Sequence, residues 1–160
     1  MVNRALKVLG FIIRNTKLFK SVGCLCTLYY ALVRSLLEFG SVIWQPYLVK
    51  DQLRLESVQN KFLNFIAFKM NIYHENHDYS NIRQVLNIPT LTSRRAKADL
   101  DFLNLILSGS LDVPDLLAAI PFRVPSHSSR NQSQFYVPTR KTSYGHNHTL
   151  HRMLRAANNQ

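Results

Sequence analysis

Five cationic side chains near the start of the chain have the clearest potential for chemistry. At 100° per residue, Arg4, Lys7, Arg14 and Lys17 fall within about 140° of one another on a helix, opposite its apolar side chains, and Lys20 follows. Cations spaced along one face suit a phosphate backbone, which presents regularly spaced negative charges. The spacing therefore predicts a nucleic-acid-binding face, and the alternative is an ordinary solvated helix face.

A second basic pair, Arg94 and Arg95, stands near the expected start of a helix. Cations at that end oppose the helix dipole, so a nearby anion would offset the cost. The pair therefore adds to the predicted nucleic-acid-binding residues. The alternative is an ion pair with Asp99, one turn along the helix.

No residue pattern predicts a metal or cofactor site. Asp99 and Asp101, the most closely spaced carboxylates, would point about 160° apart on a helix and could not share an ion. Histidines and cysteines that could hold zinc in principle are His146, His148, His151, Cys24 and Cys26. Their spacing matches no zinc module, so we expect solvated histidines there.

Motifs of nucleophilic catalysis and phosphate loops are also missing from the sequence. It contains no Gly-x-Ser-x-Gly, no glycine-rich phosphate loop and no His-Glu-x-x-His. We expect no enzyme active site in this chain.

The basic stripe must be positioned by helices, because apolar residues recur with helical spacing. Helices are predicted over residues 3–15, 22–45 and from Asp51, which would be an N-cap. The expected core side chains are Leu6, Leu9, Ile12 and Ile13 in the first helix and Leu55, Val58, Phe62, Phe65 and Ile66 in the third. In the second helix the apolar arc is about 160° wide and needs cover on most sides. Short loops then predict an all-α fold with an antiparallel, thumb-like three-helix bundle over residues 1–70.

Shorter helices and a tail are expected after the bundle. Residues 71–121 predict a helix at 79–87, a helix that Thr92 caps and Gly109 stops, and a helix that Asp112-Val113-Pro114 starts and that runs through Ile120. From residue 122 the apolar periodicity is lost and Pro, Ser, Asn and His become frequent. Residues 122–160 are therefore expected to form a loosely ordered basic tail with one short helix at 149–157.

Charge favours a polyanionic partner. The net charge is +11 over 160 residues, with 10 basic against 3 acidic residues in 1–70 and 6 against none in 122–160. The longest uncharged run, residues 21–33, is too short to span a membrane, so nucleic acid is the preferred partner. Cys24 and Cys26 are too close in sequence to form a good disulfide, which fits an intracellular setting.

Six pieces of the chain, in order, are similar to reverse transcriptases of jockey-type non-long-terminal-repeat retrotransposons. They are Leu-Gly-Phe-Ile-Ile-Arg (9–14), Leu-Val-Arg-Ser-Leu-Leu-Glu-Phe-Gly-Ser-Val-Ile-Trp-Gln-Pro (32–46), Leu-Glu-Ser-Val-Gln-Asn-Lys-Phe-Leu (55–63), Ile-Arg-Gln-Val-Leu-Asn-Ile-Pro-Thr-Leu-Thr-Ser-Arg-Arg (82–95), Ser-Ser-Arg-Asn (128–131) and Arg-Lys-Thr-Ser-Tyr-Gly-His-Asn-His (140–148). The order and spacing of these pieces carry the resemblance, which covers nearly the whole chain.

The resemblance implies a thumb and C-terminal region whose helices grip an RNA or DNA template–primer without sequence preference. The catalytic palm of the family carries paired aspartates, and this chain has no Asp-Asp, so the resemblance implies a non-catalytic fragment that partners a missing palm domain. A nuclear location also follows from it. Two alternatives stay open: a free-standing small basic nucleic-acid-binding protein, and a helical protein-interaction module derived from a mobile element.

Overall fold

The computed structural model describes residues 1–75, 77–124 and 133–159, and within them the all-α prediction is confirmed. The only extended pairing in the described residues is a single antiparallel bridge between Phe122 and Phe135. The chain forms two compact units. Unit 1 contains residues 1–41 and 46–94, and unit 2 contains residues 42–45 and 95–160. This division differs from the predicted segments 1–70, 71–121 and 122–160.

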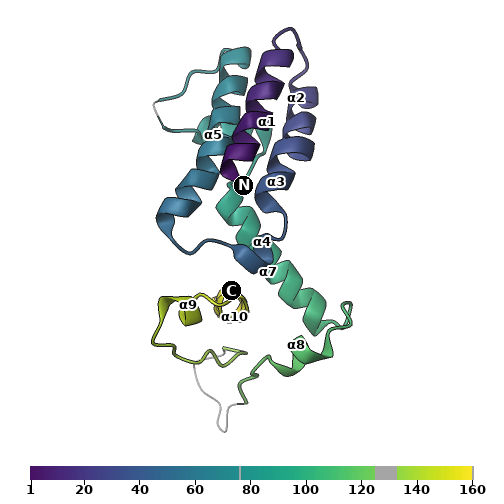
Figure 1. The fold of residues 1–160 in the computed structure, drawn as a ribbon, viewed down its shortest axis with the longest axis vertical. Helices are drawn as coiled ribbons and strands as arrows, with labels where there is room; N and C mark the ends of the chain where they lie inside the picture. The colour runs from purple at the N-terminus through teal and green to yellow at the C-terminus, as the bar shows by residue number, and fades with distance from the viewer. Residues whose placement is uncertain (76, 125–132, 160) are drawn as a thin grey trace. The chain divides into compact units, whose positions relative to one another are not determined.

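Three helical columns make up the body of unit 1. Figure 1 shows α1 lying between the column of α2, η1 and α3, which runs in the opposite direction, and α5, which runs the same way as α1. The elements of this unit are α1 (Val2–Asn15), α2 (Val22–Leu28), the π-helical turn η1 (Tyr29–Arg34), α3 (Ser35–Glu38), α5 (Val49–Met70), α6 (Ser80–Leu86) and the first residues of α7 (Leu91–Leu107).

The core of unit 1 follows the predicted spacing only in part. Leu55, Val58, Phe62 and Ile66 are buried as predicted, whereas Ile13 and Phe65 are only partly covered. In α1 the fully buried residues are Ala5, Leu9 and Ile12, whereas Leu6 is only partly covered. Ala5 lies one turn before Leu9 and therefore shares its buried face. Facing α1, the rings of Tyr29 and Phe62 stack with centroids 4.1 Å apart and planes 7° from parallel.

The predicted single helix over 22–45 is wrong. Helical geometry ends after α3, because Phe39 has ψ 119° and Gly40 has φ 62°, and α4 (Ser41–Trp44) begins a separate turn. A positive φ is cheap only for glycine, so Gly40 permits this break. The buried line of the second column is narrow, and it consists of Leu25, Tyr29, Val33 and Leu37. The rest of the predicted wide arc is less covered than expected.

Two helix starts also differ from prediction. α5 begins at Val49 after Leu48, so Asp51 lies in the first turn and is not the N-cap. α7 begins at Leu91, and its capping hydroxyl is that of Thr90, which accepts from the Ser93 amide at 3.0 Å. The predicted stop at Gly109 is consistent with the structure, because Gly109 follows the end of α7 with φ 70°.

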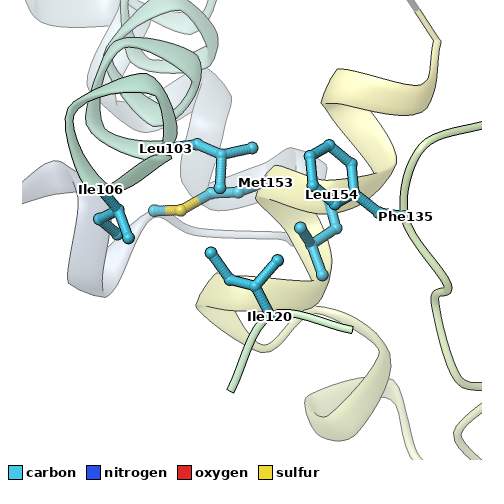
Figure 2. Close-up of a cluster of buried hydrophobic side chains, with 6 residues drawn as sticks. All are labelled: Leu103, Ile106, Ile120, Phe135, Met153 and Leu154. Carbon is cyan, nitrogen blue, oxygen red and sulfur yellow. The ribbon is translucent and has the colours of Figure 1, made fainter. Parts of the chain in front are cut away.

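Unit 2 contains the remainder of α7 together with α8 (Pro114–Ala118), α9 (Ser143–His146) and α10 (Thr149–Asn158). Its core cluster, drawn in Figure 2, consists of Leu103, Ile106, Ile120, Phe135, Met153 and Leu154. Half of these side chains come from the segment expected to be a loosely ordered tail, so that expectation is wrong for the described residues. The helix predicted at 149–157 is present as α10. The piece at 128–131 lies outside the described residues.

Candidate nucleic-acid interface

Helix α1 separates an apolar face from a basic face. Its buried side chains, Ala5, Leu9 and Ile12, repeat every three or four residues, which fixes the orientation of the whole helix. The opposite face is therefore turned to solvent. Arg4, Lys7, Arg14, Lys17 and Lys20, the predicted stripe, are all exposed.

Lys69 of α5 holds the loop that carries Lys17 and Lys20, and we call its contacts with this loop the clamp. The Lys69 ammonium donates to the carbonyl oxygens of Thr16, Lys17 and Phe19 at 3.1, 2.9 and 2.6 Å. These carbonyls lie at and beyond the carboxyl end of α1, where a positive charge also stabilises the helix dipole. Lys69 thereby fixes the backbone from which Lys17 and Lys20 project.

No carboxylate among the described residues pairs with the stripe. The first 37 residues contain no aspartate or glutamate. None of the five stripe cations forms an ion pair with another residue in the described part of the chain. Five unpaired positive charges on one surface produce a local potential that attracts polyanions.

Of the two predicted arginines, one is buried and the other forms an ion pair with a glutamate. Arg95 is only 1% exposed. Arg94 makes a bidentate pair with Glu38, with Nε and Nη2 donating to the two carboxylate oxygens at 2.6 and 3.0 Å. This hydrogen-bonded pair raises the pKa of Arg94. The carboxylate of Asp99, the alternative partner, accepts a hydrogen bond from Nε of Arg152 at 2.7 Å.

Further exposed groups of unit 1 were not predicted from the sequence. On α5, Lys50, Arg54 and Lys61 are exposed, and Arg54 has only a loose partner in Asp51 at 4.0 Å. On α1, Phe11 is 59% exposed within the basic stripe. The place of Phe11 within the stripe could have been predicted, because position 11 falls between positions 4 and 7 on a helical wheel.

Other site chemistry finds no support in the described residues. They contain no cluster of three or more histidine, cysteine, aspartate or glutamate side chains able to hold a metal ion. None of their helices combines the length and the apolar character needed to cross a lipid bilayer.

Comparison with known proteins adds no relative from which a function could be transferred. No family model, curated protein or solved structure matches this chain.

Proposed function

We propose that this chain binds nucleic acid through its phosphate backbone, without sequence preference, using the outer face of α1 and the loop that follows. The observation that carries the proposal is the exposed, unpaired stripe of Arg4, Lys7, Arg14, Lys17 and Lys20. Contacts from such side chains to phosphates fix position and orientation but read no bases.

The cellular context that we propose is the thumb and post-thumb region of a jockey-type retrotransposon reverse transcriptase. The ordered sequence pieces described above support this context, and so does the confirmed all-α character. In that setting the basic face would hold a template–primer duplex while a separate palm domain performs phosphoryl transfer. A free-standing basic nucleic-acid-binding protein would use the same face.

A second candidate, a protein-interaction module, has its own observation in unit 1. Leu32, which belongs to the apolar arc that was expected to need cover, is 45% exposed, and Phe39, which follows α3, is 82% exposed. Exposed apolar side chains of this kind mark protein contacts. If they meet another protein, such as a palm domain, the free chain lacks that cover and should self-associate through the same surface. Replacing Leu32 by Gln should then abolish the self-association seen by sedimentation.

The first test of the proposed function is equilibrium binding of the full chain to short duplexes of unrelated sequence over a series of salt concentrations. About four phosphate contacts predict a slope of log affinity against log salt near −4, with similar affinity for every sequence. A slope near zero, or strong dependence on sequence, would refute backbone binding by this stripe.

A further inference from the structure

Phe11 is an exposed aromatic ring in the middle of the basic stripe. It is 59% exposed, whereas the three buried residues of the same helix are at most 3% exposed. Burying a phenylalanine side chain is worth about 1.5–3 kcal/mol, and a ring that is 59% exposed forgoes a large part of that gain. Other rings of unit 1 are more exposed, such as Phe68 at 83%, so it is the place of Phe11 among cations, and not exposure alone, that points to a partner.

The surroundings of Phe11 specify the chemistry of its partner. Lys7 lies one turn before it and Arg14 nearly one turn after it, while Arg4 lies two turns before, so all four share one line of the helix surface. The Arg14 guanidinium folds back against Gly10, because a Cβ there would lie 3.3 Å from Nη1. Positive charge therefore stands on both sides of the ring.

A partner that satisfies both features must carry repeated negative charge and flat rings. Nucleic acid carries both in every nucleotide, whereas a lipid headgroup surface has no flat rings and an acidic peptide has them only at its aromatic residues. Within a duplex the bases are already stacked on one another, so their faces are closed to a protein side chain. In a single strand they are open, and aromatic side chains between cations are how single strands are bound without sequence preference.

We propose that Phe11 stacks on an unpaired base, so that α1 prefers single-stranded nucleic acid, or a strand leaving a duplex end, to a continuous duplex. The proposal rests on the proposed function, because Arg4, Lys7 and Arg14 would hold the flanking phosphates. It adds the substrate class: a strand with at least one base free to stack.

The test compares the full chain with Phe11→Leu, Phe11→Trp and the control Phe39→Leu. Leucine keeps an apolar side chain but removes the aromatic face, and Phe39, also in unit 1 and also exposed, follows Glu38 and not a cation. Each variant is titrated against a mixed-sequence single strand, the same strand with abasic sites, and the matching duplex. Circular dichroism checks that each variant folds.

We expect Phe11→Leu to weaken single-strand binding roughly ten-fold, which is the order of one lost base–aromatic stack. Phe11→Trp should retain the affinity, and Phe39→Leu should not change it. Duplex affinity should stay within about two-fold in all variants, because their charge is unchanged. Wild type should lose its preference on the abasic strand.

Two outcomes separate this inference from the proposed function. If Lys7→Gln with Arg14→Gln weakens binding to both strand types but Phe11→Leu changes neither, the stacking proposal is overturned and backbone binding stands. If the double variant binds both strand types as wild type does, both proposals are overturned. Equal loss of single-strand and duplex affinity in Phe11→Leu would also overturn stacking on an unpaired base.

Discussion

Buried polar residues of unit 1 form a relay that links its helices. The Tyr29 hydroxyl donates to Gln59 Oε1 at 3.0 Å, and Gln59 Nε2 donates to the Pro89 carbonyl at 2.9 Å. Both side chains are fully buried, and burial raises the pKa of the Tyr29 phenol well above its ordinary value. The phenol therefore remains a neutral donor across the physiological range and connects η1, α5 and the segment before α7.

Replacing Tyr29 by Phe should destabilise unit 1 by about 1–3 kcal/mol, because Gln59 Oε1 would lose its donor in a buried site. Urea unfolding followed by circular dichroism measures the change. Tyr30→Phe is the matched control, since that ring would still lie beneath the Arg34 guanidinium, and its effect should be small. Equal stability of both variants would show that the relay contributes nothing.

Gly10 is the one glycine inside α1. Its backbone is ordinary helix, so a side chain brings no backbone strain, and the nearest obstacle to a Cβ is the flexible end of Arg14 at 3.3 Å. Gly10→Ala should therefore stabilise the protein by about 0.5–1 kcal/mol, through helix propensity. Thermal unfolding measures this gain. A lowered melting temperature would mean that Arg14 needs its place over Gly10.

At the scale of elements, the end of α1 depends on α5. Lys69 satisfies three backbone carbonyls of the loop at residues 16–19, and its contacts span 50 to 53 positions in sequence. A lysine near the end of a helix gives no sign that it caps a different helix. The clamp was therefore beyond sequence analysis, although the stripe that it positions was not.

Lys69→Met should loosen the loop and destabilise the protein by about 1–2 kcal/mol, since it removes charge-assisted hydrogen bonds at a partly exposed site. Amide hydrogen exchange should become faster at residues 17–20. Lys61→Met, which removes an exposed lysine of the same helix, is the control and should leave exchange there unchanged. Unchanged exchange in Lys69→Met would contradict the clamp.

Strongly periodic elements were predictable, and elements fixed by distant partners were not. Apolar spacing located α1 and the body of α5, because one buried face decides each of them. The break at Gly40 was missed because the apolar pattern continues through it. Thr92 was misread as a cap, because its amide and hydroxyl donate to Glu56 of α5 at 2.7 and 3.0 Å, a partner 36 residues away.

Across the whole molecule, the carboxyl-terminal segment is part of a core and not an appendage. Phe135, Met153 and Leu154 are buried, and Asn158 exchanges hydrogen bonds with the Phe135 backbone at 3.1 and 2.9 Å. The segment lacks periodicity because its apolar residues are few and widely separated. Sequence patterns that depend on repetition therefore could not reveal it.

Arg152 and Asp99 join this segment to α7 within unit 2. Two hydrogen bonds of 2.7 and 3.1 Å connect them, and the Asp99 side chain is 3% exposed. Arg152→Met should destabilise unit 2 by about 3–5 kcal/mol, because it leaves a buried carboxylate without its partner. Adding Asp99→Asn should recover part of that loss. A single variant as stable as wild type, measured by amide exchange over residues 133–159, would contradict this role.

The predicted binding residues include an exposed group and one buried arginine. The five stripe cations are exposed because the apolar face of α1 determines where they point, which the sequence contains. Arg95 is buried because of side chains that pack around it in three dimensions, which the sequence does not reveal. The exposure of these residues was thus predictable where one helix decides it and unpredictable where the tertiary fold does.

Backbone binding by α1 is tested most directly by comparing two double variants of equal charge. Lys7→Gln with Arg14→Gln neutralises the stripe, and Arg140→Gln with Lys141→Gln neutralises two exposed cations of unit 2. Binding to duplex is measured over a salt series for wild type and both variants. The stripe variant should reduce the steepness of the salt dependence by about two units, and the control should change it by less than about one. Equal effects of the two variants, or no effect of the stripe variant, would contradict the assignment of nucleic-acid binding to α1.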